Sequence, residues 1–182
     1  MNYSITQYLL LGAVALVYVG AITGPMRKIA IRYNAVDAPD MARKIQKAPV
    51  PYLGGVAIAV GVVITSYVAL VAQDFSLKSI GLASSVLVPA ILISAMGLWD
   101  DLRGLQPWPR LIAQTSVGTA MALILIATDT MGIALGNQFL NAAVSIFWIV
   151  GITNSINFFD NLDGGAAGTV AIASFFLFLI AN

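Results

Sequence analysis

The sequence predicts an all-α protein that crosses a membrane several times. Of its 182 residues, 59% are hydrophobic and only 9% are charged, whereas soluble domains carry about 25% charged residues. The apolar stretches are continuous rather than alternating, which favours helices over barrel strands, because a backbone in lipid must satisfy its own hydrogen bonds. The net charge of +1 offers no basic field for nucleic acid, and the absence of Cys excludes disulfides and thiolate metal sites.

Six apolar stretches are each close to the roughly 20 residues that cross a bilayer. They run over Ile5–Gly24, Val50–Ala72, Ile80–Trp99, Leu111–Ala127, Phe139–Phe159 and Ala166–Ala181. The first stretch is expected to be a retained helix rather than a cleaved signal, because no positive region precedes it and the first charged side chain is Arg27. We therefore expect about six transmembrane helices in a single membrane domain, residues 1–182.

Basic residues divide unequally between the two ends of these stretches. Eight of the nine fall on one side: Arg27, Lys28, Arg32, Arg43, Lys44, Lys47, Arg103 and Arg110. Only Lys78 falls on the other side, so the positive-inside rule makes the first side cytoplasmic and places the N-terminus outside. Six of the eight aspartates share the cytoplasmic side: Asp37, Asp40, Asp100, Asp101, Asp160 and Asp163.

Two segments on that side combine charge with turn-forming residues. Val36–Gly55 holds an Asp-x-Pro turn signal at Asp37 and basic residues, among them Arg43 and Lys44, that can donate to phosphate. The adjacent carboxylates of Asp100–Asp101 repel each other and stay ionised most easily beside a cation. Hard ions such as Mg²⁺ are often bound through one or two carboxylates plus substrate phosphates. Taken alone, each segment is also compatible with an ordinary solvated loop.

A third segment, Thr153–Gly168, carries amides and carboxylates at three-residue steps. These residues are Asn154, Asn157, Asp160 and Asp163. On a continuing helix they would share one face, with Cβ atoms about 5–6 Å apart. Gly164 and Gly165 would then break the helix and let the backbone approach a ligand closely. Polar groups at membrane depth usually mark function, although hydrogen bonding between helices is the alternative.

Together the three segments resemble the polyprenyl-phosphate N-acetylhexosamine-1-phosphate transferases of glycosyltransferase family 4. The most similar branch moves N-acetylglucosamine-1-phosphate onto undecaprenyl phosphate. Its patterns look like Asp-x-Pro, Arg-Lys-x-His, Pro-x-Pro-x-x-Gly-Gly, Asp-Asp with a later Arg/Lys-Leu-x-x-x-Gln, and Asn-x-x-Asp-x-x-Asp-Gly. Here those places hold Asp37-Ala-Pro39, Arg43-Lys44-Ile45-Gln46, Pro49-Val-Pro51-Tyr-Leu-Gly54-Gly55, Asp100-Asp101, Arg110-Leu111-Ile-Ala-Gln114, and Asn157, Asp160, Asp163 and Gly164. Gln46 replaces the usual His, so we expect a weaker polar contact to substrate there.

The resemblance implies transfer of an N-acetylhexosamine-1-phosphate, N-acetylglucosamine-1-phosphate by preference, from a UDP-sugar to undecaprenyl phosphate, with release of UMP. The place implied is the cytoplasmic face of the inner membrane, where cell-wall or lipopolysaccharide synthesis begins. Mg²⁺ is the implied cofactor, with Mn²⁺ as the alternative ion. The expected catalytic residues, which are also the expected metal ligands, are Asp100, Asp101 and Asp160. The expected substrate-binding residues are Asp37, Arg43, Lys44, Asn154, Asn157, Asp163 and Gly164.

The implied partners are UDP-N-acetylhexosamine, the polyprenyl phosphate and the lipid bilayer. Family members are longer enzymes of ten or eleven spans, whose second half carries a further metal-binding Asp and a His-rich loop. This chain is therefore expected to be an N-terminal portion, either truncated or completed by a C-terminal half polypeptide, with a second copy of the chain as another partner.

Three other functions fit the sequence less fully. The first is an inactive truncated or split-enzyme membrane subunit. The second is a transporter fragment with Asp160 and Asp163 as a cation site, but these carboxylates fall at one face rather than at mid-membrane. The third is a phosphotransferase of the CDP-alcohol type, whose pattern requires Arg after Ala167, where Gly168 stands.

Overall fold

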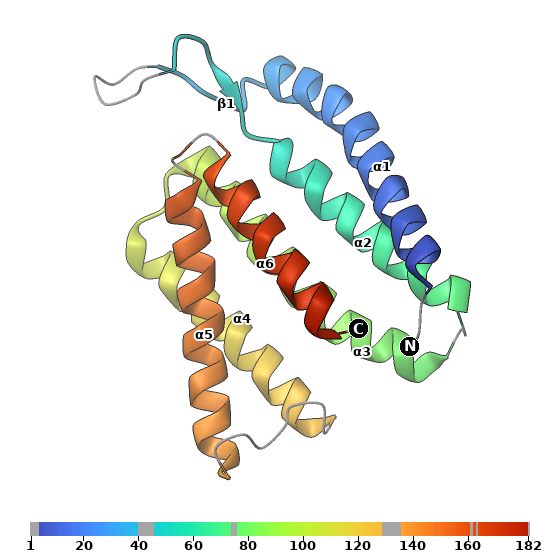
Figure 1. The fold of residues 1–182 in the computed structure, drawn as a ribbon. Helices are drawn as coiled ribbons and strands as arrows, with labels where there is room; N and C mark the ends of the chain where they lie inside the picture. The colour runs from blue at the N-terminus through green and yellow to red at the C-terminus, as the bar shows by residue number, and fades with distance from the viewer. Residues whose placement is uncertain are drawn as a thin grey trace. The chain divides into compact units, whose positions relative to one another are not determined.

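The computed structural model of the chain is almost entirely helical, and it describes residues 4–39, 46–73, 76–128, 136–160, 162 and 164–181. These residues form six α-helices and one pair of short strands (Figure 1). They divide into two compact units, Met1–Ala113 and Gln114–Asn182, and each unit is described by itself. The predicted site residues Arg43, Lys44 and Asp163 lie outside the described residues.

Helix α1, Ile5–Arg32, begins at a capping box in which Ser4 accepts from the backbone N–H of Gln7 and Gln7 accepts from that of Ser4. The apolar pattern predicted an end at Gly24, but the helix continues eight residues further, through Pro25. Charged side chains end an apolar stretch without ending a helix, and membrane helices tolerate Pro because neighbouring groups satisfy the freed carbonyl.

The chain between α1 and α2 forms a two-stranded antiparallel ribbon. Strand β1, Val36–Asp37, pairs with β2, Val50–Pro51, so that Asp37 lies opposite Val50. The ribbon continues the end of α1, because the Ala35 N–H donates to the Ala30 carbonyl at 2.8 Å. The sequence predicted turns in this segment but not the strand pairing.

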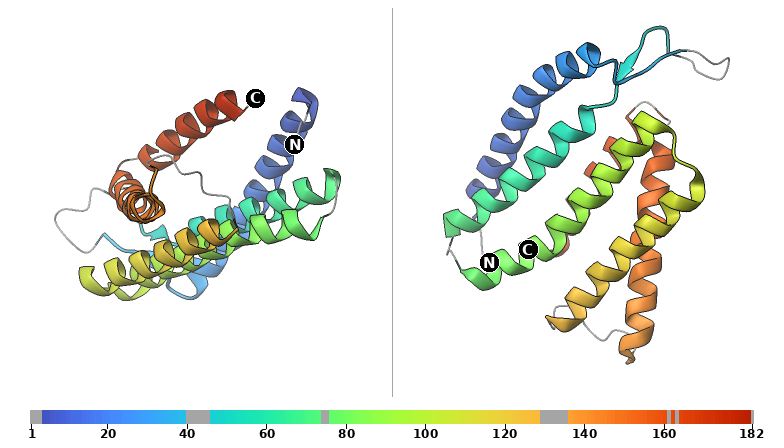
Figure 2. Two further views of the ribbon diagram at one scale, coloured as in Figure 1. Left: turned by 90° about the horizontal axis from the view of Figure 1, so that it is seen from below. Right: turned by 180° about the vertical axis from the view of Figure 1, so that it is seen from behind.

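Helices α2, Gly54–Gln73, and α3, Leu77–Arg103, complete the first unit. In both Figure 1 and Figure 2, α1 lies beside α2 and α2 lies beside α3. Helix α3 begins at Ser76, whose hydroxyl accepts from the Ser79 N–H, and ends at Gly104. Gly104 has φ of +63°, a left-handed conformation that glycine adopts without steric cost, and it turns the chain toward the next helix.

The second unit contains most of α4, Pro107–Ala127, together with α5, Gln138–Phe159, and α6, Gly165–Ala181. Helix α5 begins at Asn137, whose side chain accepts from the N–H of Phe139 at 2.8 Å. Gly118 of α4 allows a close approach to α5, because a Cβ there would lie 3.5 Å from Ile149. Small residues at such contacts are typical of membrane helix pairs.

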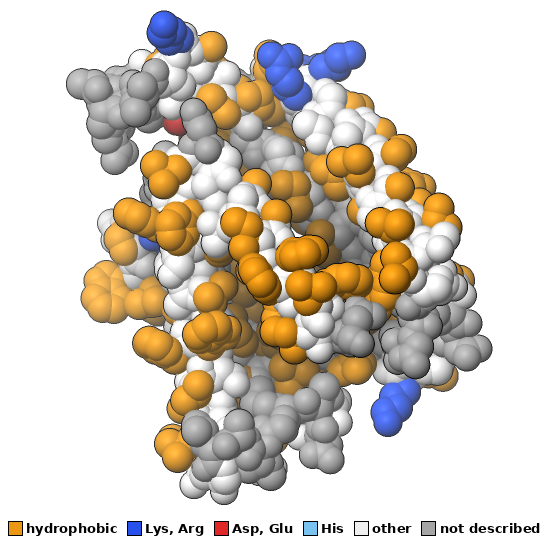
Figure 3. All heavy atoms as spheres, viewed as in Figure 1, with side chains coloured by type: hydrophobic (Ala, Val, Ile, Leu, Met, Phe, Trp, Pro, Cys, Tyr) orange, Lys and Arg blue, Asp and Glu red, His pale blue; other side chains and the backbone are white. Residues whose placement is uncertain are grey.

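Five of the helices in the described part of the chain are long and apolar enough to cross a membrane. These are α1 to α5, and α6 is a shorter apolar helix of 17 residues. Large apolar side chains cover the outside of the helices, as the orange surface in Figure 3 shows. A soluble protein rarely exposes so much contiguous apolar surface, so the chain is a multi-pass membrane protein. The all-α prediction is confirmed, with the sixth predicted crossing shorter than the other five.

Basic side chains of the first unit gather at one end of its helices. Arg27, Lys28 and Arg32 lie in the last turns of α1, and Arg103 lies in the last turn of α3. The blue groups in Figure 3 lie mostly at the ribbon end, with one group at the opposite end of this unit. Lys78 is in the first turn of α3, on that opposite end. The unequal division of charge predicted from the sequence therefore holds within this unit.

Helix α1 packs against α2 at Gly61, where an added Cβ would meet the side chain of Val19. We expect Gly61→Ala to lower the free energy of unfolding in detergent by about 1–3 kcal/mol, because Val has one strongly preferred rotamer in a helix and cannot turn aside. Thermal unfolding measures the loss, and Val19→Ala in the same chain should restore stability. Gly81→Ala in α3, which has open space around it, is the control; equal stability of the two glycine variants would contradict the packing.

Candidate functional site

Asp37 is held at both of its carboxylate oxygens. The Gln46 Nε2 donates to Oδ2 at 2.6 Å and also approaches the Asp37 carbonyl at 3.3 Å. The Tyr52 hydroxyl donates to Oδ1 at 3.2 Å. Asp37 is half-buried, so these two neutral donors supply hydrogen bonds that water provides only in part. The ribbon places all three groups together, since Asp37 ends β1 and Tyr52 follows β2.

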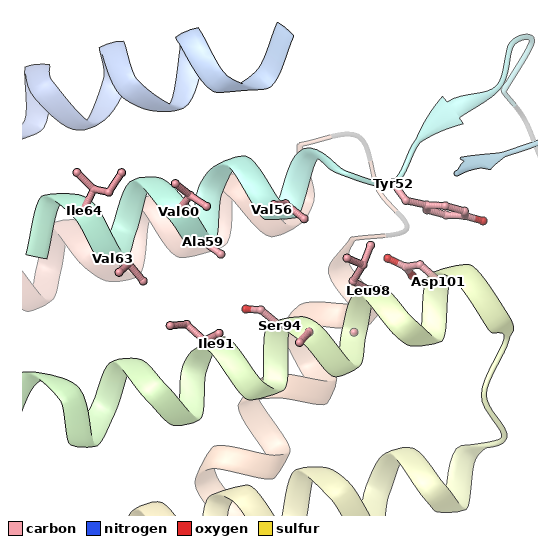
Figure 4. A pocket seen from close by; sticks show the side chains of 13 residues that line it. Tyr52, Val56, Ala59, Val60, Val63, Ile64, Ile91, Ser94, Leu98 and Asp101 are labelled. Carbon is pink, nitrogen blue, oxygen red and sulfur yellow. The ribbon is translucent and has the colours of Figure 1, made fainter. Parts of the chain in front are cut away.

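A groove of about 500 Å³ runs between α2 and α3, and its walls are almost wholly apolar. Figure 4 shows Val56, Ala59 and Val63 on one wall facing Ile91 and Leu98 on the other. The labelled polar groups of the groove are the Ser94 hydroxyl, partway along it, and the Tyr52 phenol and Asp101 carboxylate, which lie together at the ribbon end. We call this ribbon end, with Tyr52 and Asp101 on its two sides, the mouth of the groove. Its shape suits an amphiphile with a charged head and an apolar chain.

Asp100, the neighbour of Asp101, has both of its carboxylate oxygens bonded within the protein. Its Oδ1 accepts from the Leu105 backbone N–H at 2.9 Å, and its Oδ2 accepts from Arg110 Nη1 at 2.8 Å. The carboxylate keeps 18% of its side-chain surface exposed and Arg110 keeps 30%. This carboxylate therefore joins the end of α3 to the start of α4 around Gly104. A charge-assisted hydrogen bond in such a place is stronger than a neutral one.

The two adjacent carboxylates thus have different surroundings, which their neighbouring positions in the sequence did not predict. Asp101 is exposed and lines the mouth of the groove, whereas Asp100 makes contacts that fasten a connection. A divalent ion bound to substrate phosphates needs only one or two protein carboxylates. Asp101 is exposed at the mouth of the groove, and Asp100 is paired with Arg110. Within the described residues, no three His, Cys, Asp or Glu side chains lie close enough together to hold a metal ion by themselves.

In the second unit, α5 ends at Phe159, and Asp160 is its C-cap residue with φ −68° and ψ −12°. The helix on which Asn154, Asn157, Asp160 and Asp163 would share one face therefore ends at Phe159, and Asp163 lies outside the described residues. Leu162 N–H instead donates to the Phe159 carbonyl at 3.1 Å, which starts a turn. Local turn bonds of this kind replace the next helical ones before the two glycines are reached.

Two glycines complete that turn, for different reasons. Gly164 has φ of +71°, in the left-handed region where a side chain is strained. Gly165 begins α6 with its backbone so close to α5 that an added Cβ would lie 2.6 Å from the Phe159 carbonyl oxygen. The close approach at Gly165 is thus made to the protein's own backbone, whereas a Cβ at Gly164 would meet nothing within 4 Å.

Asn154 bonds between helices. Its Nδ2 donates to Gln114 Oε1 of α4 at 2.7 Å and to the Val150 carbonyl of its own helix at 2.8 Å. Gln114 is buried, with 4% of its surface exposed. A polar pair between two membrane helices holds them in register. Asn157 and Asp160, one and two turns further on, are both exposed at the end of α5.

We expect Asn154→Ala to lower the free energy of unfolding by about 0.5–2 kcal/mol, since it removes the bond to Gln114. A double variant with Gln114→Ala should lose little more, because both changes break the same contact. Thermal unfolding in detergent measures both. Asn157→Ala is the control, because Asn157 is exposed and its loss should leave stability unchanged. Full additivity of the Asn154 and Gln114 effects would contradict the pairing.

Several residues of the site were missed by sequence reasoning or given no role. Tyr52, Arg110 and Gln114 stand inside the quoted patterns, but only side-chain geometry shows that they contact Asp37, Asp100 and Asn154. The available signal was position, since each is a hydrogen-bonding side chain next to a helix end or in an apolar helix. The structure brings Asp37, Tyr52, Gln46 and Asp101 together in the first unit. It brings Asn154 to Gln114 in the second unit, with Asn157 and Asp160 following on the same helix.

The fold and these residues define a multi-pass membrane protein with a carboxylate-bearing site at the basic end of its helices. A sequence model of glycosyl transferase family 4 matches residues 83–182, more than half of the chain. The matched range includes Asp100, Asp101, Asn157 and Asp160. The chain belongs to glycosyl transferase family 4, as its motifs predicted.

Curated relatives cover most of this chain. It is 32% identical, over 87% of its length, to a probable undecaprenyl-phosphate N-acetylglucosaminyl 1-phosphate transferase of Bacillus subtilis, and covers 44% of that protein. It is 31% identical over 87% to a decaprenyl-phosphate N-acetylglucosaminephosphotransferase of Mycolicibacterium smegmatis, covering 41% of it. A phospho-N-acetylmuramoyl-pentapeptide-transferase of Levilactobacillus brevis is 30% identical over 70% of the chain. The chain thus spans less than half the length of these relatives, and no solved structure matches it.

Proposed function

We propose that this protein transfers N-acetylglucosamine-1-phosphate from its UDP derivative to undecaprenyl phosphate at the cytoplasmic face of the inner membrane, as an early step of cell-envelope polysaccharide synthesis. The observation that carries the proposal is the mouth of the α2–α3 groove. The Asp101 carboxylate and the Tyr52 phenol lie there, and the Tyr52 hydroxyl donates to the nearby Asp37 carboxylate. The apolar groove begins at these groups, which lie at the basic end of the helices. The names of the relatives support a polyprenyl phosphate as the acceptor and N-acetylglucosamine phosphate as the transferred group.

In the proposed reaction, a phosphate oxygen of the lipid attacks the β-phosphorus of the UDP-sugar. The new P–O bond joins lipid and sugar phosphates, the bond to UMP breaks, and UMP leaves with the electron pair. Reactions of this kind depend mainly on positioning and charge stabilisation. Asp101 is proposed to orient the reacting phosphate or its counter-ion, with Asp160 and Asn157 contributing from α5. Arg43, Lys44, Asp163 and Gly164 remain proposed substrate contacts.

Mg²⁺, or Mn²⁺ in its place, is proposed as the cofactor. When bound, a divalent ion screens the negative charges of the two phosphate groups. Asp101 and Asp160 are the carboxylates we propose as its ligands. We propose Asp100 as a positioning residue instead, because its two oxygens accept from Leu105 and Arg110.

The test is a transfer assay with radiolabelled UDP-N-acetylglucosamine and undecaprenyl phosphate in detergent. It uses both the 182-residue chain and the complete product of its gene. We expect lipid-linked product and an equal amount of UMP, abolished by a chelator and restored by Mg²⁺. UDP-N-acetylgalactosamine and UDP-glucose are tested as alternative donors, so that the assay also measures selectivity for the sugar. If the complete gene product forms no lipid-linked sugar, the proposed function is overturned. If transfer continues in the presence of the chelator, the proposed need for a divalent ion is overturned.

A further inference from the structure

The side chain of Gln46 faces the protein's own carboxylate at Asp37. Its Nε2 donates to Asp37 Oδ2 at 2.6 Å, and both residues are half-buried. Position 46 is where the family pattern has His, which led us to expect a weakened substrate contact. The Nε2–H of an amide and that of an imidazole are both donors. A glutamine can therefore make this internal hydrogen bond as a histidine would, without titrating.

The contact extends through Asp37 to Tyr52. Asp37 accepts from the Tyr52 hydroxyl on its other oxygen, at 3.2 Å. The Tyr52 backbone is held as well, because its N–H donates to the Ala35 carbonyl at 3.1 Å next to the ribbon. Hydrogen bonds therefore hold both the backbone and the side chain of Tyr52. A phenol held at its hydroxyl loses the freedom to swing about its first two torsions.

Tyr52 is also one side of the mouth of the groove. Figure 4 shows its ring at the end of the α2–α3 groove, near the Asp101 carboxylate of α3. The ring therefore forms part of the lining of the groove at the end where Asp101 also lies. A ring free to rotate would have to be ordered again each time a ligand bound, and that ordering lowers affinity.

We propose that Gln46 is a positioning residue that acts through Asp37 to hold the Tyr52 ring at the mouth of the groove. It governs the affinity for the phosphate-bearing ligand and does not take part in the transfer itself. The inference rests on the proposed function, which supplies the ligand. It gives Gln46 a role that acts through Asp37 rather than by direct contact to substrate, and it gives Tyr52 a role in binding that the family motifs do not.

The first experiment measures KM and kcat with undecaprenyl phosphate as the varied substrate, for the complete gene product in detergent. We expect Gln46→Ala and Tyr52→Phe each to raise KM about two- to tenfold, the factor that one net hydrogen bond represents. Because both act through the same ring, the double variant should resemble either single one. Gln138→Ala, an exposed glutamine at the start of α5, is the matched control with unchanged KM.

The second experiment uses Gln46→His, which should retain the wild-type KM because imidazole also donates. An imidazole beside the Asp37 carboxylate has its pKa raised above the usual value of about 6.5. The protonated imidazole therefore raises the free energy of unfolding at pH values below its unfolded-state pKa. This added stability is lost as the pH rises through the raised folded-state pKa. Tyr52 and Lys47 are the other ionisable groups described around Gln46, and the comparison with wild type removes their contribution because both proteins carry them. The thermal midpoint of Gln46→His relative to wild type should therefore rise as pH falls across this window.

The possible outcomes separate the two proposals. A pH-independent difference in thermal midpoint overturns the contact between position 46 and Asp37. Wild-type turnover with unchanged KM in Gln46→Ala, or a fall in kcat alone, overturns the positioning role and leaves the proposed function standing. A complete gene product without turnover overturns the proposed function and this inference with it, whereas raised KM with rescue by His supports both.

Discussion

Asp101→Asn is expected to lower the rate of sugar-phosphate transfer by a factor on the order of 10²–10⁴, with membrane insertion intact. The physical reason is that Asp101 is exposed at the mouth of the groove, where a carboxylate can act on a bound phosphate or its counter-ion. The amide keeps the shape and removes the charge. Initial rates of UMP release measure the loss, and thermal unfolding verifies that the variant is folded.

Asp100→Asn is the matched control for this prediction, because it makes the same chemical change one residue earlier. It should lower the free energy of unfolding by roughly 1–2 kcal/mol, since it weakens the bond to Arg110 in a partly exposed place. Arg110→Gln should lower the free energy of unfolding by the same amount. The double variant with Asp100→Asn should lose little more than either single variant. Identical profiles for Asp100→Asn and Asp101→Asn, or a wild-type rate in Asp101→Asn, would contradict the division of roles.

Gly165→Ala is expected to lower the free energy of unfolding by about 1–3 kcal/mol and to reduce transfer as well. The new methyl group would meet the Phe159 carbonyl oxygen, which belongs to the backbone and cannot turn away. Relief of that contact would move the start of α6 against the end of α5, which carries Asn157 and Asp160. Thermal unfolding and the transfer assay measure the two effects.

Gly168→Ala, one turn further along α6, is the control for the Gly165 variant. It has open space around the added Cβ, so it should be neutral or stabilise the helix by about 0.5–1 kcal/mol. Opposite signs for the two changes are the expected result. A Gly165→Ala protein as stable and active as the wild type would show that the close approach of α6 to Phe159 is not maintained.

Composition alone predicted the helical membrane fold, because the cost of an unsatisfied backbone in lipid leaves few alternatives. Helix ends were harder to predict. The end of α1 was expected at Gly24 and lies at Arg32, since hydropathy reports where lipid contact stops rather than where backbone hydrogen bonding stops. The ribbon of β1 and β2 was not predicted, because two residues on each strand carry no periodic signal.

The site was predicted as a set of residue types but not as a set of contacts. The motifs identified Asp37, Asp100 and Asp101, and the three-residue spacing within Thr153–Gly168 identified Asn154. Which carboxylate lies exposed at the groove and which one fastens a loop depends on single hydrogen bonds, such as that from Arg110 to Asp100. Such bonds depend on side-chain torsions, which a motif does not encode. The convergence of the clusters of the first and second units stays a prediction.

Helix α1 has 28 residues and is therefore about 42 Å long, roughly 12 Å more than the hydrocarbon thickness of a bilayer. If its apolar start lies at the outer edge, its last two turns rise among the lipid headgroups, carrying Arg27, Lys28 and Arg32 with them. The ribbon that follows would then stand in the layer where lipid phosphates and water-soluble nucleotides coexist. Basic side chains at that depth attract anionic lipids. The phosphatidylglycerol or cardiolipin content of the surrounding membrane would therefore change how deeply α1 lies in the bilayer.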